Sequence, residues 1–248
     1  MAAARRLQRR RDRDRAGRFL AEGPQAVREA LAAGVVVELF GTAGAASRYA
    51  DLAGAISPVT DEALAALAET VHPQGLVAVC EQVDVPLTAA LAKRPRLVAA
   101  AVDIRDPGNA GTILRTADAA GAGAVVFAGE AVDPYNGKCV RASAGSLFHV
   151  DVVRERAPDA AIAALRRAGI QVLAATGHGD DNLDDLLDAG ILSGPTAWLF
   201  GSEAHGLRTD LLDAADRRVR VPIYGGAESL NLAAAAAVCL YASARAMR

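Results

Sequence analysis

The sequence predicts an α/β protein whose larger, C-terminal part contains a parallel sheet. From Arg96 onward, strand-like apolar runs alternate with segments long enough to form helices. The 248 residues are 52% hydrophobic but only 4% aromatic, so aliphatic side chains must build the core. A chain of this length favours two domains over one.

The first segment of the chain is strongly basic. Residues 1–18 contain eight arginines and two aspartates, a net charge of +6, so the remaining residues carry −8. We predict a basic, flexible arm over residues 1–16. Such an arm can bind a phosphate backbone through counterion release, but charge alone favours a solvated tail equally.

A small α/β domain is predicted next, over residues 17–85. Hydrophobic spacing predicts its elements, which are a helix at 19–32, a buried strand at 35–40, a helix at 61–70 and a strand at 75–83. Pro86 and Pro95 bound a segment that breaks this pattern. We therefore expect residues 86–95 to be the interdomain linker and residues 96–248 to be the second domain.

Six strands are expected in the second domain. Their sequences, in order, are RLVAAAVDI, AVVFAG, FHVDVV, IQVLAAT, TAWLFG and RVRVPI. In parallel sheets, ligands bind beyond the carboxyl ends of the strands. The loops after Ile104, Thr176, Phe200 and Pro222 are therefore the places to look for a site.

Several classes of protein are disfavoured by composition. No apolar run approaches the roughly 20 residues that a membrane span needs, and the N-terminus lacks the apolar core of a signal peptide. We expect a cytoplasmic protein with no membrane association. The three cysteines are far apart and the four histidines are isolated, so we predict reduced thiols and no metal site.

The first unusual loop lies between the strand ending near Ile104 and the next helix. Pro107 and Gly108 predict a turn, and Asn109 is a good N-cap for the helix that follows. Arg115 comes six residues later, about 120° around the helix from Asn109. A helix N-terminus with these side chains can bind an anion.

A purely structural role for this loop, without a ligand, stays open. Arg115 could simply pair with Asp106 or Asp118 at the surface, and this segment alone favours that reading. Gly111 leaves room for close backbone approach, which needs no ligand.

Two further loops carry glycines and polar residues. Gly201, Glu203 and Gly206 directly follow the strand TAWLFG, a weak pattern by itself. Pro222 begins a loop that contains Ser229 and Asn231, either of which could cap the Ala-rich helix that runs to the C-terminus.

Taken together and in this order, the three loops resemble the motifs of the SPOUT methyltransferases, specifically of the SpoU (TrmH-like) branch. Those enzymes methylate ribose 2′-hydroxyls in RNA. The matching residues are Asn109, Gly111 and Arg115; Gly201, Glu203, Gly206 and Leu207; and Pro222, Ser229, Leu230 and Asn231. Residues 138–153 are also similar to the family's segment between its first two motifs. The likeness covers roughly residues 95–248 and is closest to ribosomal RNA members, including the thiostrepton-resistance group.

The resemblance implies a specific fold and cofactor. The parallel sheet would end in a deep trefoil knot, an exception to the rule against knotted chains. The smaller domain would be an L30e-like unit that recognises RNA. The methyl donor would be S-adenosylmethionine, and the small side chains of the C-terminal helix would allow it to pack against the knotted loop.

The same resemblance implies site residues. A catalytic set would comprise Asn109, Arg115, Glu203, Ser229 and Asn231. Cofactor contacts would fall on three strand ends and the last loop, at Ala174, Ala175, Thr176, Leu199, Phe200, Gly201, Val221, Ile223, Ser229 and Leu230. The family assigns a base to the position of Arg115, but a guanidinium is normally fixed in its charged form, so a role as base and a role as electrostatic anchor both stay open.

The resemblance also implies partners. We expect a homodimer whose active site is completed by the Arg115 of the other subunit. RNA would be the substrate, with ribosomal RNA favoured and transfer RNA still possible. Candidate RNA contacts are the arginines of the arm and two cations near the site, namely Arg5, Arg6, Arg9, Arg10, Arg11, Lys138 and Arg141.

Two other functions compete with this interpretation. An RNA-binding assembly factor could keep this scaffold without turnover, but it would not need the whole motif set. A dinucleotide oxidoreductase is disfavoured because no G-x-G-x-x-G follows an early strand. Neither the target nucleotide nor a link to antibiotic resistance can be deduced from these residues, since shape contacts select the RNA.

Overall fold

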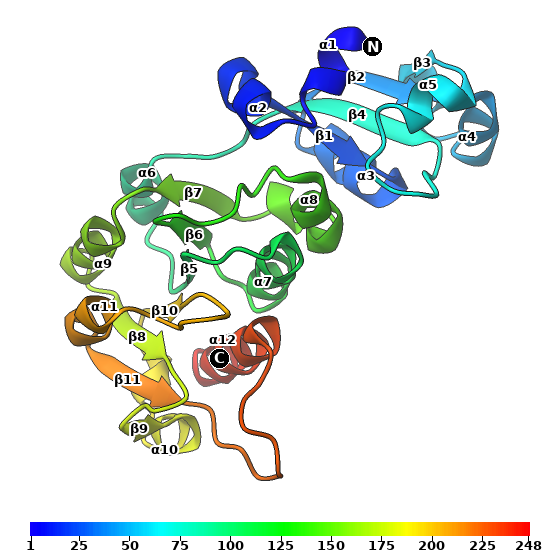
Figure 1. Ribbon diagram of the computed structural model, residues 1–248. Helices are drawn as coiled ribbons and strands as arrows, with labels where there is room; N and C mark the ends of the chain where they lie inside the picture. Colours follow the sequence, from blue (N-terminus) through cyan, green and yellow to red (C-terminus); the bar gives the residue numbers. More distant parts are fainter.

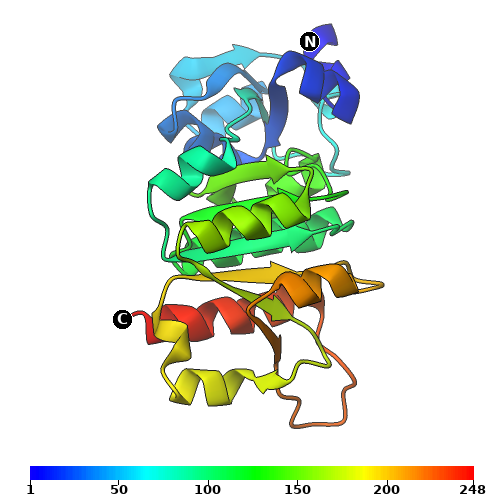
Figure 2. The same ribbon diagram turned by 90° about the vertical axis from the view of Figure 1, so that its left-hand side faces the viewer.

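The computed structural model describes residues 1–248 and contains two β-sheets. A four-stranded sheet lies at the N-terminal end of the molecule and a seven-stranded sheet forms the rest (Figure 1). Strand β7 of the larger sheet lies nearest to the small sheet, and β9 lies farthest from it (Figure 2).

The small sheet has the order β1-β4-β2-β3, in which only the β2–β3 pair is parallel. Its strands are β1 (Arg18–Glu22), β2 (Val36–Gly41), β3 (Ile56–Pro58) and β4 (Leu76–Glu81). The helices of this part are α1 (Ala2–Arg6), α2 (Arg10–Ala16), α3 (Pro24–Ala32), α4 (Ala43–Arg48) and α5 (Asp61–Ala65), with a 3₁₀ turn at Ala53–Ala55. Helix α5 is therefore shorter than the helix predicted over 61–70.

The prediction of a helix over 19–32 is wrong for the first half of that segment. Residues Arg18–Glu22 form β1, and α3 begins only at Pro24. Gly23, at φ +91°, turns the chain between the two elements, and Pro24 occupies the first helical position, where its missing N–H costs nothing.

The flexible arm expected over residues 1–16 is also not what the structure contains. Helix α1 packs against the small sheet through Ala4 and through Leu7, the residue that ends it, and both are buried. Arg13 is only 3% exposed. These three buried residues, among many exposed arginines, give the segment a packed face that its net charge concealed.

The linker expected over residues 86–95 contains a helix, α6 (Leu87–Ala92), whose Leu87 and Ala90 are buried. Prolines on either side made this segment resemble a loop, although Pro86 is a suitable residue at a helix start.

The large sheet has the order β7-β6-β5-β10-β8-β11-β9, and every pair in it is parallel. Its strands are β5 (Leu97–Val102), β6 (Ala124–Ala128), β7 (Asp151–Glu155), β8 (Gln171–Ala175), β9 (Asp181–Asn182), β10 (Thr196–Phe200) and β11 (Arg217–Arg220). The α/β class with a parallel sheet is thus confirmed. The strand expected at 148–153 is displaced, because residues Ser146–Phe148 form a 3₁₀ turn before β7.

Helices cover both faces of this sheet. They are α7 (Pro107–Ala119), α8 (Gly137–Ser143), α9 (Pro158–Arg167), α10 (Leu183–Asp188), α11 (Thr209–Ala214) and α12 (Leu232–Ala246), with a 3₁₀ turn at Ile191–Ser193. Alternate residues of β5 point to different cores: Leu97, Ala99 and Ala101 join the core beneath α7, α8 and α12, whereas Val98, Ala100 and Val102 join the core beneath α6, α9 and α11. Covering both faces explains why these strands are apolar throughout.

Small side chains allow the helices of the first face to approach one another. A Cβ on Gly111 of α7 would overlap the carbonyl oxygen of Cys139 in α8. At the centre of the sheet, the buried indole Nε1 of Trp198 donates to the hydroxyl of Ser243 in α12, at 2.9 Å. These contacts fix α7 against α8 and α12 on the sheet, and thereby position Asn109 of α7 and Asn231, the residue that precedes α12.

The two parts of the chain share one continuous core. Phe19 of β1 packs on Tyr135 of the larger part, with ring centroids 4.7 Å apart. The Tyr135 hydroxyl accepts the Val83 N–H at 2.8 Å and donates to Asp84. The small sheet is therefore packed firmly onto the large one.

Candidate functional site

A cavity of about 630 Å³ opens at the carboxyl ends of β8, β10 and β11. Its walls are the ends of these strands, the loop 201–206 and the segment 228–232, which leads into α12. This volume is in the range of small-molecule sites. The cavity lies where the parallel-sheet rule places a ligand.

Gly201 brings two chain segments together at one wall of this cavity. A Cβ at this position would overlap the backbone of Gly206 and Leu207. The loop from Ser202 to Gly206 closes on itself through two backbone hydrogen bonds between these end residues. Only glycine at position 201 permits this close approach of the chain. The glycine of the sequence motif is therefore explained by backbone packing.

A hydrogen-bond network joins the three predicted loops. The Glu203 carboxylate accepts the Nδ2–H of Asn109 at 3.0 Å. The Asn109 Oδ1 in turn accepts the Nδ2–H of Asn231 at 3.3 Å. The structure therefore brings Asn109, Glu203 and Asn231 together.

The Glu203 carboxylate also accepts the backbone N–H groups of Arg105 and Asp106, at 3.3 and 3.2 Å. Partial burial by itself would raise the pKa of Glu203, but the hydrogen bonds from Asn109 and these backbone groups lower it overall. Glu203 is thus an anion that holds the loop after β10 against the start of α7.

Asp106, and not Asn109, is the N-cap of α7. Its Oδ1 accepts the Asn109 N–H at 2.8 Å, and its Oδ2 pairs with Lys138 Nζ at 2.8 Å. The contact with Lys138, together with the Asn109 N–H, lowers the pKa of Asp106. Because Asp106 satisfies the helix start, the side chain of Asn109 is free to bridge Glu203 and Asn231.

At the start of α12, Asn231 is the capping residue. Its Oδ1 accepts the N–H groups of Ala233 and Ala234. Ser229 and Leu230 line the cavity but are exposed, and Ser229 makes no hydrogen bond. Of the two predicted caps, Asn231 performs that role.

Arg115 is not part of the cavity wall. It is exposed on α7 and its side chain has no hydrogen bond or ion pair. The surface pairing that the sequence favoured is wrong, because Asp106 binds Lys138 and Asp118 binds His149. Its guanidinium is therefore available to a group from outside the chain.

Most predicted cofactor contacts line the cavity. Those that do are Ala175, Thr176, Phe200, Gly201, Val221, Ile223, Ser229 and Leu230. Ala174 and Leu199 do not, since their side chains are buried in the core beneath α6, α9 and α11. The alternation of side chains along β8 and β10 points these two away from the cavity.

Among the lining residues that were not predicted, four have polar side chains. Ser202 and His205 lie in the loop after β10, His178 follows β8, and Glu228 precedes Ser229. The Gly-His-Gly sequence at 177–179 was the available signal for His178, since a Cβ on Gly179 would overlap the backbone of β11.

The candidate RNA contacts fall into two groups. Arg5, Arg6, Arg9, Arg10 and Arg11 are exposed on α1 and α2 or between them. Lys138 pairs with Asp106, and Arg141 pairs with Glu22 of β1 at 3.1 Å. The second group thus stabilises the structure as it stands.

All three cysteines are buried and unpaired, and burial raises the pKa of Cys80 to about 12. No group of three or more histidine, cysteine or carboxylate side chains is arranged around a metal position. None of the helices is both long enough and apolar enough to span a bilayer.

Comparisons with known proteins agree with this geometry. Residues 96–241 match the model of the SpoU rRNA Methylase family, and residues 2–78 match the MRM3-like substrate binding domain. The 23S rRNA (guanosine(2553)-2'-O)-methyltransferase RlmP of Bacillus subtilis is 35% identical over 237 residues, which cover 95% of this chain and 92% of that protein.

Solved structures are similar over the whole chain. The SpoU methyltransferase AviRb from Streptomyces viridochromogenes, in complex with the cofactor AdoMet, superimposes with a TM-score of 0.85 and 31% identity, over 98% of this chain and 96% of that one. An AdoMet-bound rRNA methyltransferase from Sinorhizobium meliloti gives 0.82 and 31%, over 98% and 93%. These matches confirm the resemblance drawn from the three motifs: this chain belongs to the SpoU rRNA methylase family.

Proposed function

We propose that this protein transfers a methyl group from S-adenosylmethionine to a ribose 2′-hydroxyl of RNA, and that 23S ribosomal RNA is the substrate. The observation that carries the proposal is the contact of three loops, through Asn109, Glu203 and Asn231, beside a cavity at the strand ends. Similar proteins named as 23S rRNA 2′-O-methyltransferases, and similar structures that hold AdoMet, support it.

The cavity fits this cofactor. Val221, Leu230 and Phe200 provide apolar walls, and the backbone at Gly201 is open to the cavity. Glu203 and Glu228 are the carboxylates at the rim, which suits a ligand with an ammonium and a sulfonium charge. When bound, S-adenosylmethionine supplies a methyl group that is activated by the positive sulfur.

The protein's main task is then to align the acceptor ribose with the donor. Glu203 already accepts three N–H groups, so we assign it to holding the loops rather than to removing a proton. Asn109 and Asn231 fix the cavity rim, and Ser229, with no internal hydrogen bond, is available to the acceptor.

Arg115 would act as a cation. An exposed guanidinium stays charged, and the desolvation that a base role requires is absent in the single chain. We assign Arg115 to holding a phosphate beside the target ribose and stabilising negative charge that develops on the ribose oxygen.

A homodimer would complete this site. The exposed apolar residues Val238 and Tyr241 lie on one stripe of α12, and Ile223 and Leu230 are exposed near its start. Arg115 lies outside the cavity of its own chain, as expected if it serves the other subunit. Sedimentation at micromolar concentration should give a dimer, and a fully active monomer would contradict this part of the proposal.

The remaining expectations concern the fold. We propose that the C-terminal part of the chain forms a trefoil knot; the match of residues 96–241 to the SpoU family supports it. We also propose that residues 17–85 form an L30e-like RNA-recognition domain that the helices of residues 2–16 extend, with residues 96–248 as the catalytic domain. A ribosomal substrate would place the protein in the cytoplasm.

The exposed arginines of the N-terminal helices would contact RNA. Arg5, Arg6 and Arg9 line a groove against α5. Their replacement by alanine should weaken RNA binding and reduce its salt dependence. Removal of residues 1–16 is a poorer test, because it would leave the partner of Arg13 buried without a counter-charge.

The decisive test of the reaction is methyl transfer from labelled S-adenosylmethionine to total RNA, followed by mapping of the modified nucleotide. We expect a single 2′-O-methyl group in 23S rRNA. If transfer RNA is labelled instead, then transfer RNA and not 23S rRNA is the substrate. If the protein binds RNA but transfers no label, an assembly factor is favoured.

A further inference from the structure

A second hollow lies on the same edge of the large sheet as the cofactor cavity. Two adjoining cavities, of about 230 and 710 Å³, share Arg10, Glu130, Ala131 and Val132 in their walls. Together they form a cleft between α2 and the carboxyl ends of β5, β6 and β7. We call this hollow the interdomain cleft.

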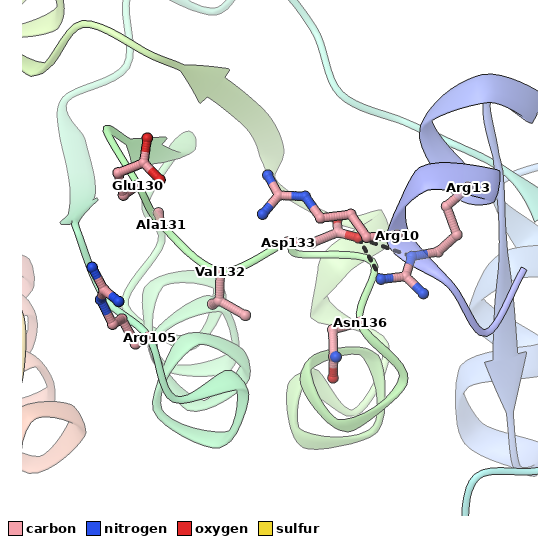
Figure 3. Close-up of a pocket in the computed structure, with 8 residues that line it drawn as sticks. All are labelled: Arg10, Arg13, Arg105, Glu130, Ala131, Val132, Asp133 and Asn136. Atoms are coloured by element: carbon pink, nitrogen blue, oxygen red, sulfur yellow. Dashed lines mark hydrogen bonds and ion pairs between the residues drawn. The ribbon is translucent and has the colours of Figure 1, made fainter.

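Arginines from both parts of the chain line the interdomain cleft. Arg10 comes from α2, Arg105 follows β5 and Arg156 follows β7. Figure 3 shows Arg10 and Arg105 on opposite sides of the loop that carries Val132 and Asp133. A ligand in the cleft would therefore meet guanidinium groups from two sides.

These three arginines are electrostatically available. Arg105 and Arg156 make no side-chain hydrogen bond or ion pair, and Arg10 has one long contact, 3.8 Å, to Asp14. A ligand that replaces water here would face guanidinium groups whose hydrogen-bonding capacity is unused.

The carboxylates of the cleft are mostly occupied. Asp14 and Asp84 bind Arg154, and Asp133 binds Arg13. Glu155 accepts only the backbone N–H of Ala157, and the Glu130 side chain has no partner. The lining as a whole has as many carboxylates as arginines, so what the cleft offers an anion is the unused hydrogen-bonding capacity of its free guanidinium groups and not a net positive charge.

The walls of the cleft are held in place. Arg13 Nη2 and Asp133 Oδ2 form a 2.7 Å ion pair in which both residues are 3% exposed, as the dashed lines of Figure 3 mark. Arg13 also donates to the carbonyl groups of Leu7 and Gln8. At the opposite wall, the Asp103 carboxylate accepts the N–H of Glu130 at 2.7 Å. The backbone segments that form the two walls are thus held before any ligand binds, while the free arginine side chains can adjust to a ligand.

The cleft is connected to the candidate active site through Arg105. The backbone N–H of Arg105 donates to Glu203, which borders the cofactor cavity, while the side chain of Arg105 lines the cleft. A chain molecule that leaves the active site along this edge of the sheet would enter the cleft next.

We propose that the interdomain cleft binds the sugar-phosphate backbone of the RNA next to the target nucleotide, with phosphates contacted by Arg10, Arg105 and Arg156. Planar guanidinium groups bind phosphate oxygens in pairs, and such contacts fix the register of the RNA without reading its sequence. The proposal depends on RNA being the substrate, as proposed above.

The test is RNA affinity of full-length protein across a series of KCl concentrations, with a 23S rRNA transcript as the probe. Arg105→Ala, Arg10→Ala and Arg156→Ala should each weaken binding several-fold and reduce the slope of log K against log salt by about 1. Glu130→Gln should strengthen binding, because it removes a negative charge from the cleft. The matched control is Arg167→Ala on α9, an exposed arginine on the other face of the sheet.

The outcomes separate this proposal from the proposed reaction. If the cleft variants bind the transcript as tightly as Arg167→Ala does, with an unchanged salt slope, the proposal that the cleft binds RNA is wrong. Affinity is measured without turnover, so it tests the cleft even if methyl transfer fails. Methyl transfer by the wild-type protein tests only the reaction. Calorimetry with S-adenosylmethionine checks that each variant is folded.

Discussion

The cofactor cavity and the interdomain cleft lie on one edge of the same sheet but differ in chemistry. The cavity, at β8, β10 and β11, has glycine, apolar and carboxylate groups and no arginine in its walls. The cleft, at β5, β6 and β7, is lined by five arginines and five carboxylates, and three of the arginines have no close partner. The difference indicates that one edge serves two ligands of opposite charge, a cationic cofactor and a polyanion.

The two regions also differ in how their walls are fixed. Around the cavity, the neutral amides of Asn109 and Asn231 connect to one carboxylate, Glu203. Around the cleft, a buried ion pair between Arg13 and Asp133 joins two parts of the chain. Changes at one region should therefore leave ligand binding at the other largely intact.

The largest effect is expected at Arg115, which belongs to neither wall. Arg115→Ala should lower kcat by about 10²–10³-fold, because charge stabilisation at the reacting oxygen is lost. The affinity for S-adenosylmethionine, measured by calorimetry, should not change. A large loss of cofactor affinity would show instead that Arg115 belongs to the cavity.

The next effect concerns stability. Arg13→Ala would leave the Asp133 carboxylate buried without a counter-charge, which typically costs about 3–5 kcal/mol. In a protein of this size the melting temperature should fall by about 6–20 °C. The double variant Arg13→Met with Asp133→Leu should recover much of this loss. A melting temperature within about 1 °C of wild type for Arg13→Ala would mean that the pair does not fix the cleft.

A smaller effect is expected at Gly201. Gly201→Ala forces the backbone at Gly206 and Leu207 to move, at a cost of about 1–3 kcal/mol. Affinity for S-adenosylmethionine should fall about 10- to 100-fold, while affinity for the 23S rRNA transcript stays as in the wild type. Gly225→Ala is the control, since a Cβ there meets open space. If Gly201→Ala lowers the affinity for both ligands equally, the claim that the two regions bind their ligands independently is wrong.

The smallest effect is a pH dependence at the contact between the two parts of the chain. His149 lies between Asp118 of α7 and Glu29 of α3, at 2.8 and 3.1 Å, and these hydrogen bonds raise its pKa. The stabilisation is therefore complete below the ordinary histidine pKa and is lost as pH rises through the higher folded-state pKa. Because His149 is partly exposed, the melting-temperature advantage over His149→Gln at pH 5.5 should be about 1–2 °C and should disappear by pH 9. An advantage that grows with pH would contradict this assignment.

The sequence predicted the large sheet well because its strands are buried on both faces. An unbroken apolar run such as residues 97–102 can only be a strand or a buried helix, and its length favours the strand. The prediction of a single helix over 19–32 was wrong, because this segment contains two short elements instead of one long one. A short strand, a glycine and a helix place apolar residues at spacings that imitate one helix.

The site was predictable only in part. The motifs identified Asn109, Glu203 and Asn231, but not the contacts between them, which depend on how α7 and α12 pack. The partnership of Arg13 with Asp133 spans 120 positions and has no local signal. The role of Arg105 has no sequence signal, because a single arginine after a strand is common and the cleft that it lines is formed by segments far apart in the chain.

The measurement that tests the division between the two regions most directly is hydrogen exchange with each ligand in turn. S-adenosylmethionine should slow exchange of backbone amides in 200–207 and 221–232, and the 23S rRNA transcript should slow it in 103–106 and 129–136. A footprint of the cofactor in the cleft segments, or of the transcript confined to the cavity segments, would contradict the account.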